Sequence, residues 1–197
     1  ARHHGVRSAM PVGEAMRRCP SLTIVSPEHG RYGEVSSEVF EIMRSVTPLV
    51  EGISIDEAFL DVSGLRLHYA SVTAIGSRIR SLIRSEVGIP SSVGIATTKF
   101  VAKLASKHAK PDGLLLIEAG TELDFLHPLE VSELWGVGEA TRAHLRELGI
   151  QTIGDVARAP VGLLERRVGT ASAHHLSSLA NGRDPRRVEG EAGARSI

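Results

Sequence analysis

The fold is decided by residues 49–61, which read LVEGISIDEAFLD. Two short runs rich in Ile, Val and Phe, residues 49–55 and 58–62, flank the acidic pair Asp56 and Glu57. Runs of this kind, separated by two residues, are typical of paired strands around a tight turn, although this turn lacks the usual glycine. The sequence therefore predicts a hairpin with two adjacent carboxylates at its tip.

Segments on both sides of the hairpin predict helices that cover a sheet. Apolar residues recur at helical spacing in three of them, and two others are short apolar runs typical of strands. The predicted helices cover residues 34–46, 71–86 and 98–108, and the predicted strands cover residues 92–96 and 114–117. The order helix, strand, strand, helix, strand, helix, strand indicates an α/β or α+β sheet layer covered by helices.

The sequence changes character after Glu118. Short helical pieces separated by glycine turns follow, without a convincing strand, and they predict a small all-helical unit. The tail, residues 181–197, contains glycines, Pro185 and mixed charges, and it has little apolar surface to bury. We therefore expect this tail to be a linker.

The composition indicates a soluble protein rather than a membrane or secreted one. The chain has 197 residues, enough for one large domain or two small ones, and its single cysteine, Cys19, cannot form an internal disulfide. No run of about 18 apolar residues is present, and a reducing, cytoplasmic location is expected. Basic and acidic residues number 23 each, so a nucleic-acid surface would have to come from local clustering of charge.

The acidic turn lies in a segment with no counter-charge. Residues 45–65 contain no basic residue but four acidic ones, Glu51, Asp56, Glu57 and Asp61. Mg²⁺ takes a few hard oxygen ligands and leaves its other positions to water or phosphate oxygens, so the adjacent pair suits a site that recruits a metal-bound nucleotide. The alternative is an exposed hairpin tip whose acidic residues are only solvated.

The four lysines of the chain are concentrated in one short segment. Lys99, Lys103 and Lys107 follow an i, i+4, i+8 pattern and form a stripe along the predicted helix, and Lys110 extends it into the next loop. The stripe lacks the interleaved glutamates of an ordinary solvated helix face and can bind phosphates as a set of point charges, although a solvated face remains the alternative interpretation. A negative metal site near a positive phosphate surface is what phosphoryl transfer requires.

A glycine pair in the helical unit forms a third motif. Gly136, Val137 and Gly138 precede a predicted helix, as in a helix-hairpin-helix, and Trp135 stands where a proline is more usual. Such glycines expose backbone N–H groups at a helix N-terminus, where a phosphate can bind without any base being read. A simple helix cap remains the alternative interpretation.

Four stretches of the chain, in order, match motifs of one known family. Residues 54–61, SIDEAFLD, closely resemble the palm motif of the Y-family DNA polymerases, most of all the bacterial polymerase IV or DinB type. Residues 1–11, ARHHGVRSAMP, resemble the fingers motif of that family, and residues 93–113 resemble its second palm motif. The glycine hairpin at residues 136–138 lies where the thumb of the family belongs.

The resemblance implies a template-directed, error-prone DNA polymerase of the lesion-bypass class. In this reaction the 3′-hydroxyl of a primer attacks the α-phosphate of a dNTP with the help of two Mg²⁺ ions. By the resemblance, Asp56 would ligate both ions and Glu57 the ion nearest the primer, which makes both the expected catalytic residues. Arg2 and Lys110 would bind the triphosphate, together with Ser54, which flanks the metal turn.

The resemblance also implies contacts with primer-template DNA. Ala9 would lie near the templating base. The residues expected to contact the DNA backbone are Gly136, Val137, Gly138, Lys99 and Lys103. A non-catalytic module that grips the DNA backbone, with the palm as a scaffold only, is the alternative function.

The family also implies a domain organisation. We expect four parts along the chain. They are a partial fingers segment (residues 1–27), a ferredoxin-like palm sheet layered with helices (28–117), a helix-hairpin-helix thumb (118–184) and a linker (185–197) towards an absent little finger domain. The first palm strand of the family, with a further aspartate ligand and an aromatic sugar gate, would precede Ala1, and the tyrosine expected before the fingers arginine is missing. Because these parts are missing, we expect that the 197-residue chain alone cannot extend a primer. We also expect the protein to be a monomer, and any sliding clamp to bind outside this chain.

Overall fold

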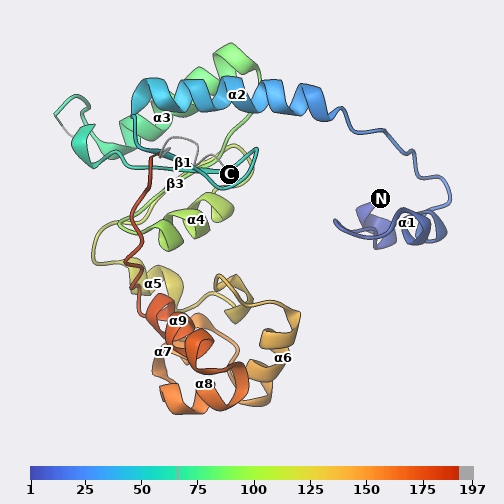
Figure 1. The fold of residues 1–197 in the computed structure, drawn as a ribbon, viewed down its shortest axis with the longest axis vertical. Coiled ribbons are helices and arrows are strands. Elements are labelled where there is room, and N and C mark those ends of the chain that lie inside the picture. Colours follow the sequence, from blue (N-terminus) through green and yellow to red (C-terminus); the bar gives the residue numbers. More distant parts are fainter. Residues whose placement is uncertain (66, 191–197) are drawn as a thin grey trace, which may run out of the picture. The chain divides into compact units, whose positions relative to one another are not determined.

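The computed structural model describes residues 1–65 and 67–190, and the chain divides into two units, residues 1–34 and residues 35–197 (Figure 1). The α-helices in the described ranges are α1 (Val12–Arg18), α2 (His29–Val46), α3 (Val72–Leu82), α4 (Lys99–His108), α5 (Glu122–Leu126), α6 (Glu139–Glu147), α7 (Ile153–Arg158), α8 (Val161–Val168) and α9 (Thr170–Ala180). The strands are β1 (Val50–Gly52), β2 (Ala58–Leu60), β3 (Val93–Ile95) and β4 (Leu114–Leu116). Shorter helical turns are η1 (Arg2–His4), η2 (Ser63–Leu65), the π-helical η3 (Ile83–Val87) and η4 (Val131–Glu133).

The acidic hairpin is present, with shorter strands and a wider turn than the sequence predicts. β1 and β2 pair antiparallel, with Glu51 opposite Phe59. The N–H groups of Ile53 and Ser54 both donate to the carbonyl of Glu57, at 2.8 and 3.2 Å, and close the connection. No residue of this connection has a positive φ, which explains why the turn needs no glycine.

Strands β3 and β4 form a βαβ unit with helix α4. They pair in parallel, with Val93 opposite Leu114, and α4 is the connection between them. Gly94 lies directly against α4, because a Cβ atom at this position would be 2.1 Å from the carbonyl oxygen of Ala102. The described strands form two separate two-stranded sheets rather than one layer, and of the two predicted classes the fold is α+β.

Helices α2 and α3 pack together through a cluster of buried isoleucines. The cluster consists of Ile42, Ile75, Ile79 and Ile83. α2 begins at His29, earlier than the predicted residue 34. The prediction missed the first turns because they are polar and lack the apolar spacing that indicates a helix. An ion pair of 3.0 Å joins Arg31 to Glu34 there.

Helices α5 to α9, together called the helical unit, gather together in Figure 1. Its core is continuous with one side of α4. The buried residues that show this are Leu126, Leu134, Leu145, Ile153, Leu164, Leu176, Phe100 and Val101. The predicted absence of a strand holds apart from one isolated bridge, between Glu130 and Thr152. Among the helices described, none is both long and apolar enough to cross a membrane.

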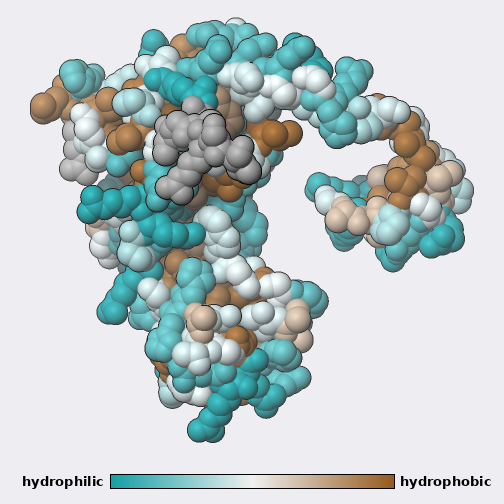
Figure 2. All heavy atoms as spheres, in the orientation of Figure 1, coloured by the Kyte–Doolittle hydropathy of each residue, from teal (hydrophilic) through white to brown (hydrophobic). Residues whose placement is uncertain are grey.

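Residues 1–34 form the other unit, with η1, α1 and the start of α2. Arg18 joins its two helical elements, since the guanidinium donates to the carbonyl of Gly5 at 3.2 Å and pairs with Glu14 at 2.6 Å. Ile24 and Val25, between α1 and α2, are 55% and 81% exposed. Figure 2 shows this connecting segment as a hydrophobic stretch.

The tail after α9 is bound to the rest of its unit as far as residue 190. The carboxylate of Asp184 is only 2% exposed and accepts a hydrogen bond of 3.0 Å from the N–H of Phe100, in the first turn of α4. The N–H of Glu189 donates to Glu51 at 2.7 Å. Over residues 183–190 the tail is therefore more than a linker, and its anchors are polar contacts with residues distant in sequence, which its lack of apolar residues does not reveal. Residues 191–197 of the predicted linker lie outside the described residues.

We expect Gly94→Ala to lower the free energy of unfolding by more than about 2 kcal/mol, because the atoms that a Cβ would strike belong to the backbone of α4. Gly162→Ala in α8 is the matched control, since nothing lies within 4 Å of a Cβ there. It should keep the stability or raise it by about 0.5 to 1 kcal/mol. Urea denaturation followed by circular dichroism measures both, and equal stability of the two variants would contradict this packing.

Acid is expected to destabilise the helical unit through Asp155. Hydrogen bonds from the backbone N–H groups of Thr152 and Gln151, at 2.8 and 3.0 Å, lower the pKa of Asp155 from 3.8 to about 2. The unfolded chain keeps the ordinary pKa, so the stabilising contribution is complete above about pH 4 and is lost as the pH falls towards 2. Asp155→Asn should therefore show a smaller loss of unfolding free energy between pH 4 and pH 2 than the parent.

The exposed Glu139 supplies the control for this measurement, and Glu139→Gln should keep the pH profile of the parent. Urea denaturation at a series of pH values gives all three profiles. A parent-like slope for Asp155→Asn would show that the carboxylate is not stabilised by these N–H groups.

Candidate active site

The acidic turn presents Asp56 to solvent in a fixed orientation. The hydroxyl of Ser54 donates to Asp56 Oδ1 at 2.5 Å, and the N–H of Asp56 donates back to that hydroxyl at 3.3 Å. The hydroxyl of Ser36, on α2, donates to the carbonyl of Ile55 at 2.6 Å and ties the turn to that helix. Ser54, predicted to flank the metal turn, therefore orients the carboxylate itself.

Helix α4 meets the acidic turn at Glu57. Lys103 Nζ lies 2.7 Å from Glu57 Oε2, and both side chains are partly exposed. The structure thus brings together one member of the acidic pair and the middle lysine of the predicted stripe. This contact joins residues 46 positions apart in the chain.

Lys99 makes a more buried ion pair one helical turn earlier. Its side chain is 9% exposed, and Nζ lies 2.6 Å from both carboxylate oxygens of Glu51 and 2.9 Å from the carbonyl of Arg187. Burial alone would raise the pKa of Glu51, but hydrogen bonds from Lys99 and from the N–H of Glu189 leave it below its usual value. Lys99 therefore stabilises the charged form of a partly buried carboxylate.

All three lysines of the stripe on α4 form ion pairs with carboxylates. Lys107, the third member, pairs with Glu133 of η4 at 2.5 Å. Each stripe lysine thus has a carboxylate partner, and each partner comes from a different element. The helix itself has no interleaved glutamates, as its sequence shows, but spacing along one helix says nothing about residues that other elements place against it.

Asp56 and Glu57 offer the donor set that Mg²⁺ prefers. Both are hard oxygen ligands, and Mg²⁺ is commonly held by one or two carboxylates together with substrate phosphates. Within residues 1–65 and 67–190, no group of three or more His, Cys, Asp or Glu side chains is arranged to hold a metal by itself. Two carboxylates fill only part of the coordination sphere of Mg²⁺, so the pair suits an ion that also takes water or phosphate oxygens as ligands.

Lys110 follows α4 in an exposed loop held by two arginines of the preceding helical segment. Arg80 donates to the carbonyl of Asp112 at 2.5 Å and to its carboxylate at 3.1 Å, and Arg84 pairs with the same carboxylate. The hydrogen bond from Arg80 is the first cause of the lowered pKa of Asp112, followed by the charge of Arg84. Asp112 adopts a φ of 46°, so these contacts fix a backbone conformation that is uncommon for a non-glycine residue.

Arg2 and Ala9 belong to the unit of residues 1–34 and are both exposed. Arg2 lies on η1. Ala9 has a φ of 62°, in the left-handed region. Their expected contacts with triphosphate and template stay predictions.

The glycine hairpin has the local geometry that its sequence predicts. Gly136 has a φ of 94°, which favours glycine, and Gly138 is the N-cap residue of α6. The N–H of Val137 donates to the carbonyl of Leu134 at 3.0 Å and closes the turn. Both glycines are exposed, so the backbone of the hairpin is accessible from solvent.

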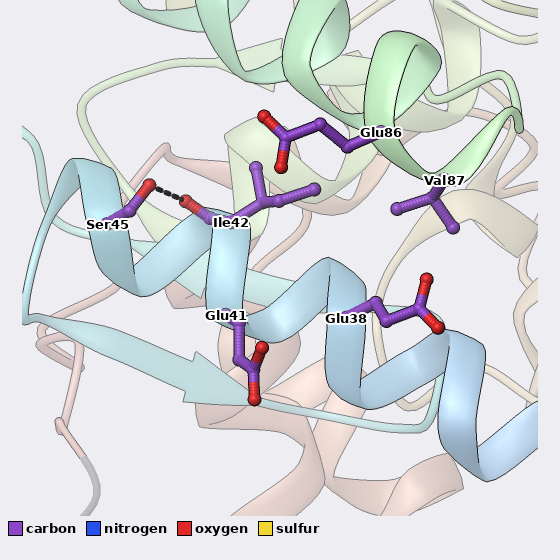
Figure 3. A pocket seen from close by; sticks show the side chains of 6 residues that line it. All are labelled: Glu38, Glu41, Ile42, Ser45, Glu86 and Val87. Atoms are coloured by element: carbon purple, nitrogen blue, oxygen red, sulfur yellow. Dashed lines mark hydrogen bonds between the residues drawn. The ribbon is translucent and has the colours of Figure 1, made fainter.

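A cavity of about 350 Å³ lies between α2 and η3, away from every predicted site residue (Figure 3). Glu38, Glu41 and Glu86 supply its charge, and Ile42 and Val87 supply its apolar wall. The hydroxyl of Ser45 in its lining already donates to the carbonyl of Ile42 at 2.7 Å. The cavity contains no residue predicted to bind nucleotide, metal or DNA.

The sequence model described as the impB/mucB/samB family matches residues 1–107, more than half of the chain. The chain belongs to this family, the Y-family of DNA polymerases. The expected relationship, drawn from four short motifs, is confirmed.

Y-family relatives match the chain over nearly its whole length. DNA polymerase IV 2 of Mesorhizobium japonicum is 47% identical over 189 residues, which cover 96% of this chain and 46% of the relative. DNA polymerase IV of Streptomyces coelicolor is 43% identical over 199 residues, which cover 100% of this chain and 42% of the relative. The chain therefore spans less than half the length of these two relatives.

Solved Y-family structures have the same fold. A DinB family error-prone DNA polymerase from Sulfolobus solfataricus is 30% identical, with a TM-score of 0.88 over 96% of this chain and 57% of that chain. An insertion ternary complex of Dbh DNA polymerase is 31% identical, with a TM-score of 0.85 over 95% of this chain and 55% of that chain. Both similarities cover nearly the whole chain, and so include both the part that contains the strands and the helical unit.

Sequence reasoning missed the residues that connect the predicted site to the rest of this Y-family chain. Glu51 and Glu133, the partners of Lys99 and Lys107, carry no motif signal. Asp112 lies inside a quoted motif, yet nothing in the sequence pairs it with α3. Asp184 belongs to a segment predicted to be a linker. Only a three-dimensional arrangement, or covariation between distant positions, could have revealed them.

Lys99→Met is expected to lower the free energy of unfolding by about 2 kcal/mol, because it removes the cation that is hydrogen-bonded to both oxygens of the partly buried Glu51. Lys107→Met is the matched control, since its side chain is 58% exposed, and should cost less than about 1 kcal/mol. Adding Glu51→Gln to Lys99→Met should restore part of the loss. Urea denaturation measures all of these variants. If Lys99 were chiefly a phosphate-binding residue, its removal would cost no more stability than the removal of Lys107.

Proposed function

We propose that the protein containing this chain is a template-directed DNA polymerase of the error-prone, lesion-bypass class. The observation that carries the proposal is the acidic pair on a fixed turn, with Lys103 of α4 against Glu57, in a chain that belongs to the Y-family. A solvated hairpin tip would need neither the hydroxyl of Ser54 on Asp56 nor a lysine on Glu57.

In the proposed reaction the 3′-hydroxyl of a primer loses its proton to water, its oxygen forms a bond to the α-phosphorus of a dNTP, and the bond from that phosphorus to pyrophosphate breaks. Two Mg²⁺ ions, when bound, activate the attacking oxygen and neutralise charge on the leaving pyrophosphate. Asp56 would hold both ions, oriented by Ser54, and Glu57 would hold the ion nearest the primer. Each carboxylate acts as a fixed oxygen ligand, so neither needs to move a proton.

Lys110 and Arg2 would bind the triphosphate of the incoming dNTP. The loop of Lys110 is suited to this role because Arg80 and Arg84 hold its neighbour Asp112, so less chain entropy is lost when phosphate binds. Ala9 would lie near the templating base. These assignments come from the family motifs.

The helical unit would act as the thumb, with residues 28–117 as palm and residues 1–27 as part of the fingers. The exposed backbone of Gly136, Val137 and Gly138 supports a contact with DNA phosphates that reads no base. For Lys99 and Lys103, also predicted to contact the DNA backbone, the ion pairs with Glu51 and Glu57 favour a role within the protein instead.

The remaining expectations stay predictions of the same proposal. These are the two-ion stoichiometry, the monomeric state, the cytoplasmic location, a sliding-clamp contact outside this chain and the inactivity of the 197-residue chain alone. A non-catalytic module that grips the DNA backbone remains the second candidate function, supported by the exposed hairpin. The experiment below separates the two.

Asp56→Asn in the intact protein should reduce primer extension by about a hundredfold to a thousandfold, the cost of removing one group that stabilises transition-state charge. It should leave the affinity for primer-template DNA nearly unchanged, because the DNA contacts lie elsewhere. Extension on a labelled primer and fluorescence anisotropy of the same duplex measure the two quantities. Asp61→Asn is the matched control and should keep most of the activity, since its carboxylate caps the N–H of Ser63.

Extension that survives in Asp56→Asn would exclude the metal assignment. DNA binding by a parent protein that extends no primer under any condition would favour the non-catalytic module.

A further inference from the structure

Trp135 lies where three parts of the structure meet. It precedes the glycine hairpin directly, and its ring centroid is 6.4 Å from that of Phe59, the residue of β2 two positions after Glu57. Lys103 Nζ lies 5.6 Å from the centroid of the same ring, and Arg186 Cζ lies 4.4 Å from it. Both distances are within the range in which an aromatic ring attracts a cation.

Arg186 is held in place independently of Trp135. Its guanidinium makes two parallel hydrogen bonds to the carboxylate of Asp184, at 2.7 and 2.8 Å. Burial alone would raise the pKa of Asp184, yet the fork with Arg186 leaves it below its usual value. Asp184 in turn accepts from the N–H of Phe100 at the start of α4. The tail segment therefore presents a pre-oriented guanidinium to the indole ring.

Lys103 is the point at which this arrangement reaches the acidic turn. A lysine side chain has many rotamers, and a single partly exposed ion pair restrains it weakly. Lys103 has two restraints, the ring of Trp135 and the carboxylate oxygen Oε2 of Glu57. The second oxygen, Oε1, has no hydrogen bond to any residue in the described part of the chain, and it stays available to another ligand.

We propose that Trp135 and Arg186 are positioning residues that hold Lys103 against Glu57 and so set the orientation of that carboxylate. The ring supplies a surface for the ammonium group, and Arg186 keeps the ring in place. The proposal rests on the proposed function, because it takes Glu57 to be a residue of the polymerase site. It adds that the segment after α9 acts on this site through an aromatic side chain next to the glycine hairpin.

Kinetics of the intact polymerase test the proposal. Lys103→Gln should lower kcat and raise the Mg²⁺ concentration for half-maximal rate by about tenfold, as is usual when a partner of a metal ligand is lost. Trp135→Leu and Arg186→Gln should change both quantities in the same direction by about threefold, the size of one cation–π contact. The KM for dNTP should stay unchanged, and Trp135→Phe should recover most of the loss.

Arg183→Gln is the matched control, because it removes the same charge from the same segment. The guanidinium of Arg183 makes no ion pair or hydrogen bond to the residues that the structure describes. It should keep the kcat and the Mg²⁺ dependence of the parent. An equal effect of Arg183→Gln and Arg186→Gln would overturn the proposal, since general charge on the segment would then explain both.

A double-mutant cycle tests the route through Lys103. In the Lys103→Gln background, Trp135→Leu should have almost no further effect on kcat, because the group it positions is already lost. Independent, multiplying effects of the two substitutions would overturn the proposal. Such effects would show that Trp135 acts on activity through general packing.

A second readout needs no activity. Trp135 is the only tryptophan of the 197 residues. Its fluorescence therefore reports on this site when it is measured in the intact protein with any tryptophan outside these residues replaced by phenylalanine. Arg186→Gln, Lys103→Gln and Glu57→Gln should each increase quenching of Trp135 by acrylamide, whereas Asp56→Asn and Arg183→Gln should not. Parent-like quenching in Arg186→Gln, Lys103→Gln and Glu57→Gln would overturn the proposal.

The two readouts separate this proposal from the proposed function. If Asp56→Asn keeps full activity, the polymerase assignment fails, whatever the fluorescence of Trp135 shows. If Asp56→Asn is inactive while Trp135→Leu and Arg186→Gln match the parent, the polymerase assignment stands and the positioning role is wrong.

Discussion

The contact between Lys103 and Glu57 is the interaction on which the candidate site depends. It is the point where α4 meets the acidic turn, and it joins a charged helix to carboxylates in a segment that contains no basic residue of its own. A pair of adjacent carboxylates without such a neighbour would repel each other and leave the turn poorly defined. With Lys103 on one carboxylate and Ser54 on the other, each acid has its own partner and a fixed direction.

The ion pairs of α4 act on geometry more than on overall stability. The partly buried pair of Lys99 with Glu51 loses much of its attraction to desolvation, and the more exposed pair of Lys103 with Glu57 is screened by water. The net effect of either pair on the free energy of unfolding is therefore small unless one partner of the more buried pair is removed. Lys99 with Glu51 and Lys103 with Glu57 instead fix how α4 lies against β1 and the acidic turn. The close fit of Gly94 under the same helix has the same consequence, because the strand and the helix have no room to slide.

The elements of the site could be predicted from the sequence, but their partners could not. The acidic hairpin, the lysine helix and the glycine turn are each marked by residues that lie next to one another or a few positions apart. All three elements are present. The partners of the lysines, and the anchoring of the tail through Asp184, join positions tens of residues apart. Local spacing therefore located the elements, but it could not show the carboxylates that pair with the lysine stripe or the contacts of the tail.

Asp184 shows why such a distant contact matters for a helix that bears so much positive charge. The N–H groups in the first turn of α4 have no acceptor inside the helix and give this end a partial positive charge, to which Lys99 adds a full positive charge. Thr98 caps only one of these groups, the N–H of Val101. The carboxylate of Asp184 satisfies a second, the N–H of Phe100, and it brings negative charge to the positive end of the helix. Because the same carboxylate orients Arg186, one buried acid stabilises the start of α4 and fixes the cation that faces Trp135.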